Sequence, residues 1–181
     1  MARQIALLRG INVGGHRKVP MARLRELMEA LGFSDVRTYV QSGNVVFTGP
    51  DAPAVEVARR LEQELAATFG FDVSVVVRSR DELAEVVEAN PLRDVATDPA
   101  RHLVVFRDSN VDLERVAHVD PAEFAPEAFH VRGRELYVWA PEGVRDSRLL
   151  KVLSEQRLGG TATARNWRTV EKLLALADEG Q

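Results

Sequence analysis

The stretch Val36-Arg37-Thr38-Tyr39-Val40-Gln41-Ser42-Gly43-Asn44-Val45-Val46-Phe47-Thr48 decides the fold of this chain. Its two outer parts, residues 36–40 and 44–48, are rich in β-branched and aromatic residues, which favour strands. The polar residues between them include Gly43, and glycine supplies the backbone conformations that a tight turn needs. The stretch therefore predicts a β-hairpin.

A helix and a strand are predicted on each side of this hairpin. Apolar residues recur at helical spacing over residues 20–31 and again over residues 55–69, and a Gly-Phe pair follows each run, as is typical of helix C-termini. Short apolar runs at residues 4–8 and 73–77 predict buried strands beyond the helices. The resulting order, β-α-β-β-α-β, is that of a ferredoxin-like unit with an antiparallel sheet.

The second half of the chain repeats this order with weaker signals. Residues 102–106 predict a strand, and Gly133 lies between two further strand-like runs. The remaining predictions are a short helix within 111–119, a helix from Ser147 to 158, a short strand at 161–164 and a final helix capped by Asn166. We therefore expect an α+β fold of two tandem ferredoxin-like halves, residues 1–78 and 101–181. A linking helix and loop at 79–100 join them, and a C-terminal helix closes the chain. The linking helix is predicted to begin with the capping box Ser79-Arg80-Asp81-Glu82.

Composition excludes several classes of protein. The chain of 181 residues contains no cysteine, so it holds no disulfide, thiolate metal site or cysteine nucleophile. Its four histidines are far apart in sequence and form no metal-binding pair, so no metal site is expected. The apolar run near the N-terminus, Ile5 to Leu8, is shorter than a signal peptide needs, and no run approaches the roughly 20 apolar residues that span a bilayer. We expect a cytoplasmic protein without a membrane segment.

Charge is distributed unevenly along the chain. Residues 1–50 contain seven Lys or Arg against three Asp or Glu, a net charge of +4, and residues 132–172 contain nine against five, again +4. Residues 51–100 contain five against eleven, a net charge of −6. Basic stretches that meet in space would attract phosphates or carboxylates. Charged residues that only solvate helix faces would give the same pattern.

The first loop, Arg9-Gly10-Ile11-Asn12-Val13-Gly14-Gly15-His16-Arg17-Lys18, is the main candidate for a binding site. Glycines let backbone N–H groups point inward, the helix that follows favours an anion at its N-terminus, and basic side chains add charge-assisted hydrogen bonds. The glycine spacing matches neither the dinucleotide fingerprint nor the P-loop. We prefer anion binding to a long loop that uses glycine only for its turns, because loops of this length in compact domains tend to be functional. The candidate residues are Arg9, Gly10, Asn12, Gly14, Gly15 and Lys18.

Two further polar motifs complete the candidate site. The hairpin turn contributes Gln41, Ser42 and Asn44, although a tight turn alone explains much of their composition. Near the C-terminus, Arg165 precedes Asn166 at a predicted helix start, and this pair would suit a carboxylate or a phosphate.

Three aromatic residues of the predicted hairpins, Tyr39, Tyr137 and Trp139, are expected on sheet faces that the helices leave uncovered. RNA-recognition domains of this topology stack bases on such a face, but neither hairpin carries their signature. We expect the uncovered faces to pack against each other or against a partner chain, because an exposed aromatic face would favour unwanted association.

Four ordered motifs resemble a bacterial family, the domain of unknown function 1697. The motifs are residues 7–15, Val19-Pro20-Met21, Gln41-Ser42-Gly43-Asn44-Val45 and Thr163-Ala164-Arg165-Asn166-Trp167. The resemblance covers nearly the whole chain. It implies a shared role for the polar positions Arg9, Gly10, Asn12, Gly14, Gly15, Gln41, Ser42, Gly43, Asn44, Arg165 and Asn166. His16-Arg17 departs from the Lys-Asn pair of the family. No activity is established for the family, so the resemblance implies no catalytic residue.

The preferred hypothesis is a cytosolic protein that binds a small anionic ligand, such as a nucleotide or a phosphorylated metabolite, between the glycine-rich loop and the Arg165 motif. Nucleic-acid binding is the second hypothesis, which the acidic middle segment and the isoelectric point of about 5.9 disfavour. A non-catalytic interaction module is the third. The sequence identifies no cofactor, and it leaves open both catalysis and assembly as a homo-oligomer.

Overall fold

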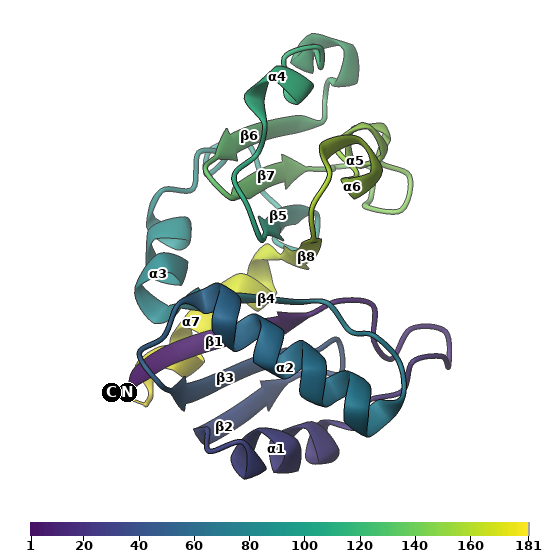
Figure 1. Ribbon diagram of the computed structural model, residues 1–181. Coiled ribbons are helices and arrows are strands. Elements are labelled where there is room, and N and C mark those ends of the chain that lie inside the picture. Colours follow the sequence, from purple (N-terminus) through teal and green to yellow (C-terminus); the bar gives the residue numbers. More distant parts are fainter. Residues whose placement is uncertain (181) are drawn as a thin grey trace. The chain divides into compact units, whose positions relative to one another are not determined.

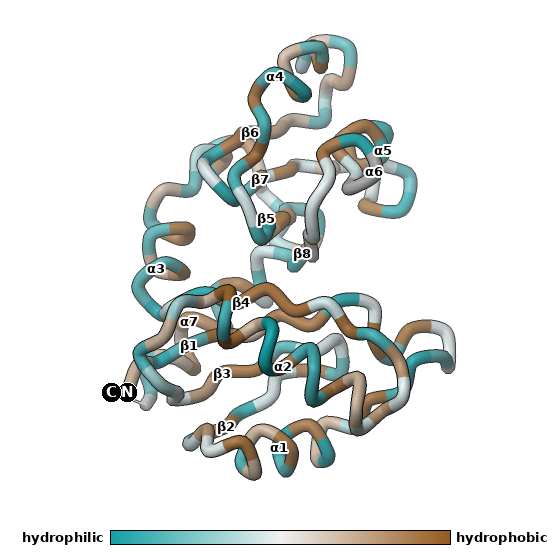
Figure 2. Tube along the Cα trace, in the orientation of Figure 1, coloured by the Kyte–Doolittle hydropathy of each residue, from teal (hydrophilic) through white to brown (hydrophobic). Residues whose placement is uncertain are grey.

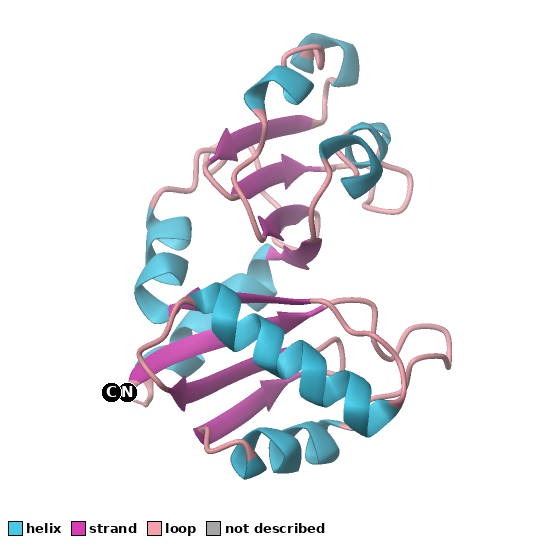
Figure 3. Cartoon of the chain, in the orientation of Figure 1, coloured by secondary structure: helices cyan, strands magenta, loops and turns pink. Residues whose placement is uncertain are grey.

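Two four-stranded antiparallel sheets with helices packed on them form the α+β framework of the computed structural model, which describes residues 1–180 (Figures 1 and 3). The chain divides into two units. The first comprises residues 1–85 and the segment from residue 172 onward, and the second comprises residues 86–171. The ranges expected from sequence differ from these units mainly in assigning the whole C-terminal helix to the second half.

The first unit contains the hairpin and its neighbours in the predicted order. Its elements are β1 (Ala2–Leu8), α1 (Met21–Ala30), β2 (Ser34–Tyr39), β3 (Asn44–Gly49), α2 (Ala54–Phe69) and β4 (Val75–Ser79). The strands lie in the order β2-β3-β1-β4, and every neighbouring pair is antiparallel. The hairpin prediction is confirmed.

The core of the first unit lies between one face of this sheet and the two helices. Alternate residues of β1, Ala6 and Leu8, face α1 and α2, and they pack with Leu24 of α1 and Leu61 of α2. Alternation of this kind is what places one set of strand side chains on one sheet face. In Figure 2 the strands β3 and β4 are mostly brown, the colour of hydrophobic residues.

The other face of the first sheet is covered by the C-terminal helix α7 (Trp167–Asp178) from residue 172 onward. Arg3 Nη2 donates to the Leu176 carbonyl at 3.5 Å, and Arg80 Nε lies 2.7 Å from the Asp178 carboxylate. The cover expected from sequence is the opposite half or a partner chain. The structure supplies the last helix of the chain instead.

The linking helix α3 (Arg80–Glu88) begins with the capping box that its sequence predicts. The backbone N–H of Glu82 donates to Ser79 Oγ at 3.1 Å, and the N–H of Ser79 donates to Glu82 Oε2 at 2.8 Å. Each side chain therefore satisfies a backbone donor that the helix start leaves unpaired.

The second unit has the same strand arrangement with shorter helices. Its elements are β5 (His102–Arg107), α4 (Leu113–Val116), the 3-10 helix η1 (Pro121–Phe124), β6 (Ala128–Arg132), β7 (Glu135–Trp139), α5 (Arg148–Val152), α6 (Glu155–Leu158) and β8 (Ala162–Asn166). The strand order is β6-β7-β5-β8. The single helix predicted from Ser147 to 158 is wrong: two short helices meet at Ser154, whose carbonyl starts the second one, and serine favours helix starts over helix interiors.

Tyr137 lies on the face of this sheet opposite Leu136 and Val138, which belong to the core of the second unit. Its side chain is fully buried, and its hydroxyl donates to the Val86 carbonyl of α3 at 2.8 Å. Burial raises the pKa of Tyr137 to about 12. The aromatic side chain is therefore part of the packing.

Among residues 1–180, no helix combines the length and the apolar composition that crossing a bilayer requires.

Candidate functional site

The glycine-rich loop between β1 and α1 folds as a miniature hairpin. The backbone N–H of Asn12 donates to the Arg17 carbonyl at 3.0 Å, and the N–H of His16 donates to the Val13 carbonyl at 3.0 Å. Gly14 and Gly15 form the two-residue turn with φ angles of 58° and 76°. Such a turn needs left-handed backbone at both central positions, which side chains oppose. The turn itself therefore accounts for this pair of glycines.

Asn12 holds the loop closed. Its side-chain oxygen accepts from the backbone N–H of Val19 at 2.8 Å, and its Nδ2 donates to the Val19 carbonyl at 2.9 Å and to the Gln41 carbonyl at 2.7 Å. Both N–H groups of the amide are thus used within the protein. Asn12 joins the loop to the β2–β3 turn and makes the loop rigid.

Arg17 fixes the other side of the loop. Its Nε donates to the Gly10 carbonyl at 3.0 Å, and its Nη2 donates to the Asp72 carbonyl. Its guanidinium lies 5.0 Å from the centroid of the Phe71 ring, a distance at which a cation is attracted to the ring face. These contacts tie the loop to the segment between α2 and β4.

The β2–β3 turn packs against the end of β1. Gly43 is buried, its carbonyl accepts from the Leu8 N–H at 2.8 Å, and a Cβ on Gly43 would lie 2.7 Å from Leu8 Cβ. Asn44 is also buried, and its Nδ2 donates to the Tyr39 carbonyl at 3.0 Å and to Ser42 Oγ at 2.9 Å. The polar side chains of the turn thus hold its own backbone in place.

Val40, the first residue of this turn, has a strained backbone. Its φ angle is +50°, which costs a β-branched residue on the order of 1–3 kcal/mol. Its side chain is 52% exposed. Such strain is often found at functional sites, and the next residue, Gln41, lines the cleft beside the loop.

A cleft of about 620 Å³ lies where the loop, the turn and the start of α1 meet. Its lining residues are Asn12, Gly15, Lys18, Pro20, Met21, Ala22 and Gln41. Lys18 is the one charged residue of this lining, which includes no carboxylate. Helix α1 begins at the cleft with no side-chain cap and no acidic residue in its first turn. Its first backbone N–H groups therefore carry the partial positive charge of an uncapped helix start.

The structure sorts the nine candidate residues of the first unit into two groups. Asn12, Gly15, Lys18 and Gln41 line the cleft, whereas Arg9, Gly10, Gly14, Ser42 and Asn44 belong to the same loop and turn but lie outside the lining. Met21 and Ala22 are absent from the residues predicted from sequence, because their contribution comes from the backbone. Pro20, typical of a helix start, was the available signal.

Arg165 and Asn166 lie in the second unit, at the end of β8. Arg165 is buried, which lowers its pKa to about 10, and its Nη1 donates to Thr163 Oγ1 at 2.6 Å and to the Ala164 carbonyl at 2.9 Å. Asn166 Oδ1 accepts from the Thr169 N–H at 2.9 Å, so Asn166 caps α7 as predicted. The arginine that the sequence suggested for a carboxylate or a phosphate is therefore buried within the second unit.

His102 and Trp167 form a stacked pair in the second unit that is absent from the residues predicted from sequence. Their ring centroids are 4.7 Å apart with an interplanar angle of 11°. The histidine is 1% exposed, burial lowers its pKa to about 4, and its Nε2 has no partner among the described residues. The start of an apolar strand was the only sign that this histidine is buried. Within residues 1–180 no group of three or more His, Asp or Glu side chains could hold a metal ion.

Residues 1–137 match the family described as "Protein of unknown function (DUF1697)". The chain belongs to this family. The matched residues include the glycine-rich loop and the β2–β3 turn, whereas Arg165 and Asn166 lie beyond them.

The solved structure of the conserved bacterial protein SP0830 from Streptococcus pneumoniae is similar to the chain over nearly its full length. The similarity covers 97% of this chain and 98% of that one, with 28% sequence identity and a TM-score of 0.76. No curated protein is significantly similar to the chain. The comparisons therefore establish the family and a shared fold.

Proposed function

We propose that this protein binds a small anionic ligand, such as a phosphorylated metabolite or a nucleotide, in the cleft beside the glycine-rich loop. The observation that carries the proposal is the pairing of an uncapped helix start with a lysine in a lining that has no carboxylate. Unpaired N–H groups at a helix N-terminus attract anions, and an ammonium group adds a charge-assisted hydrogen bond.

The rigidity of the loop supports this proposal. Asn12 and Arg17 hold the loop through hydrogen bonds to four different residues, Val19, Gln41, Gly10 and Asp72. A ligand that enters the cleft therefore needs to order little of the protein, and affinity rises when this entropic cost is small. The polar side chains of the loop position the backbone, and Lys18 and the backbone of α1 bind the anion.

We also propose that both units are ferredoxin-like and arose by duplication. The identical strand order of the two sheets supports this interpretation. Two pairs of backbone hydrogen bonds recur at matching places. Leu8 N–H donates to Gly43 as Arg107 N–H donates to Arg134, and Arg9 N–H donates to Ser74 as Asp108 N–H donates to Thr161. The basic motif at Arg165 then serves the packing of the second half.

Nucleic-acid binding is less favoured than a small anion. The sheet face that would stack bases is covered in the first unit by α7 and in the second carries the fully buried Tyr137.

The cysteine-free composition suits the reducing cytoplasm, where we propose that the protein acts.

Thermal unfolding in the presence of inorganic phosphate, nucleotides and sugar phosphates tests the anion proposal. A ligand at about 100 times its Kd adds roughly 2.7 kcal/mol to the free energy of unfolding, a shift of several degrees in Tm. Lys18→Gln and Ala22→Glu should both remove the shift. Ala22→Glu is the sharper variant, because an acidic residue in the first turn of α1 stabilises the free helix while it repels the anion.

Ala67→Glu is the matched control, since it adds the same charge at an exposed position of α2. It should leave the ligand-induced shift unchanged. A protein that no anion stabilises, or one whose stabilisation survives both cleft variants, would show that the cleft is not an anion site.

A further inference from the structure

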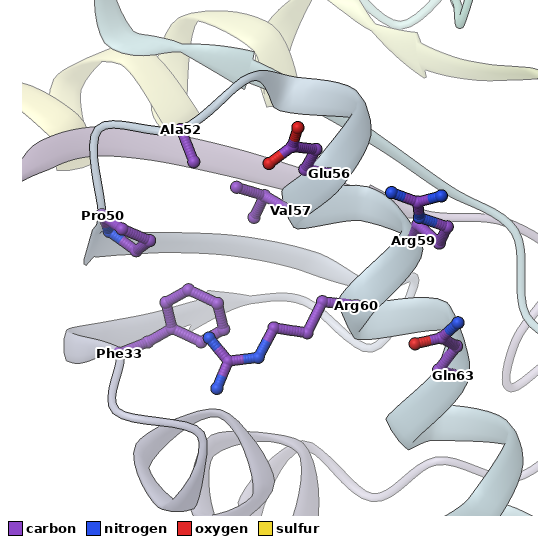
Figure 4. A pocket seen from close by; sticks show the side chains of 8 residues that line it. All are labelled: Phe33, Pro50, Ala52, Glu56, Val57, Arg59, Arg60 and Gln63. Carbon is purple, nitrogen blue, oxygen red and sulfur yellow. The ribbon is translucent and has the colours of Figure 1, made fainter.

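A second pocket, of about 450 Å³, opens on the first unit beside α2 (Figure 4). It is lined by Phe33, Pro50, Ala52, Glu56, Val57, Arg59, Arg60 and Gln63. Phe33 directly precedes β2 and Pro50 directly follows β3. The pocket shares no lining residue with the cleft beside the glycine-rich loop. Its volume lies within the roughly 300–1,000 Å³ that small-molecule sites occupy.

The floor of this pocket is apolar and preformed. Phe33 is 3% exposed, and its ring meets the Phe47 ring edge to face at a centroid distance of 4.9 Å. A Cβ on Gly49 would lie 2.9 Å from the Phe33 ring, so the ring occupies space that only glycine leaves. Val57 of α2, which is buried, completes the floor. These contacts hold the apolar surface in one arrangement before any ligand arrives.

Arg60 places a fixed guanidinium at this floor. Figure 4 shows its side chain reaching from α2 to the Phe33 ring, and the guanidinium lies 5.5 Å from the ring centroid. Arg60 Nη2 also donates to the Leu31 carbonyl at 2.8 Å. One hydrogen bond and one ring contact thus fix the planar group, while its other N–H groups have no partner within the described chain. A planar guanidinium can bind a carboxylate through two parallel hydrogen bonds.

The charges around the pocket favour a ligand with one negative charge. Arg59 makes no ion pair or hydrogen bond within the described residues, and Glu56 lies beyond ion-pair distance of both arginines. The three side chains sum to +1. A net charge of +1 attracts a single carboxylate and only partly balances the two charges of a phosphate.

We infer that this pocket binds a small amphipathic monocarboxylate, with its apolar body against Pro50 and Ala52 beside the buried Phe33 ring and its carboxylate on Arg60, while Arg59 adds positive charge to the lining. This site is separate from the anion cleft and does not depend on it. The two sites also differ in chemistry, because the cleft offers an uncapped helix start and the pocket offers an aromatic floor.

Titration of the ¹⁵N-labelled protein with three probes tests the inference. Benzoate carries both features, benzamide has the same ring without the charge, and acetate has the charge without the ring. Benzoate should shift the backbone amide signals of Phe33, Ala52, Val57 and Arg60. Benzamide and acetate should each bind at least roughly tenfold more weakly, the factor expected from the loss of one good interaction. Equal binding of benzoate and benzamide, or benzoate shifts confined to other residues, would overturn the inference.

Arg59→Gln is the decisive variant, because this exposed side chain has no partner to lose among the described residues. It should weaken benzoate binding roughly twofold, because the pocket lining loses one exposed positive charge, and leave Tm unchanged. Arg145→Gln, which removes an exposed arginine of the second unit, is the matched control and should change neither value. Equal effects of the two variants would contradict a site on α2. Lys18→Gln should leave the benzoate shifts intact, so failure of the cleft and failure of the pocket are separate results.

Discussion

The loops that follow β1 and β5 begin at equivalent positions in the two sheets. They differ in whether carboxylates occupy the backbone N–H groups of the loop and of the helix that follows. The loop after β1 is a glycine-turned hairpin that leads to an uncapped ten-residue helix beside a cleft. The loop after β5 is closed by carboxylates: Asp108 Oδ1 accepts from Thr161 N–H at 3.2 Å, and Asp112 caps the four-residue α4. Two halves with one strand order thus present opposite charges at equivalent positions. This contrast is the reason to propose the first half as the location of the candidate function.

The turns that precede β3 and β7 offer the largest expected contrast between the halves. Gly43 has a φ angle of +87° and lies against Leu8, whereas Gly133 has a φ angle of +61°, and a Cβ there would lie 3.8 Å from its nearest neighbour, Asn110 Oδ1. Gly43→Val should lower the free energy of unfolding by about 4 kcal/mol, since backbone strain and steric overlap add. Gly133→Val should cost about 1–2 kcal/mol, from strain alone.

Denaturant unfolding of the two variants measures this contrast. Equal losses would mean that the β2–β3 turn can move away from β1, and the junction of loop and turn would then not be rigid.

Local sequence signals predicted much of the fold because the interactions behind them are local. The Gly-Phe pairs that end α1 and α2, the capping box at Ser79 and the cap at Ser147 each involve residues within about one helical turn. The break at Ser154 was missed because the leucine spacing on either side still fits one helix.

The site could be predicted only in part because its decisive contacts join distant residues. Asn12 contacts Gln41, 29 positions away, and a polar side chain in a loop looks the same whether it binds a ligand or the backbone. Arg165 precedes a predicted helix start and therefore suggested an anion site, yet its side chain is buried in the second unit. The contacts by which α7 covers the first sheet include one between residues 173 positions apart, Arg3 and Leu176. No periodicity or motif in the sequence predicts such a contact.

A buried titratable group distinguishes the second half from the first. His102 is buried with a pKa of about 4, against an ordinary value of 6.5, whereas His16 in the first loop is exposed. Between these two pH values, His102 is therefore protonated in the unfolded chain and neutral in the folded chain. The contribution of His102 to the free energy of unfolding should be constant above pH 6.5. Below pH 6.5 the free energy of unfolding should fall by about 1.4 kcal/mol per pH unit, and the total loss should reach about 3 kcal/mol near pH 4.

Unfolding free energies measured between pH 7 and pH 4 test this dependence. His102→Phe keeps an aromatic ring against Trp167 and should reduce the slope. An unchanged slope in His102→Phe would show that other groups cause the acid sensitivity.

The smallest expected effects come from the polar side chains that close the two loops. Asn12→Ala removes three hydrogen bonds and should cost about 2 kcal/mol, because the Val19 N–H loses its partner in a partly buried site. Asp108→Ala should cost about 1 kcal/mol or less, since its bond to Thr161 is exposed and water can replace it.

Ligand-induced shifts in Tm distinguish the two variants further. Asn12→Ala should weaken anion binding as the loop loosens, and Asp108→Ala should leave anion binding unchanged. Equal effects on binding would remove the reason to place the function in the first half, because the two loops would then contribute alike.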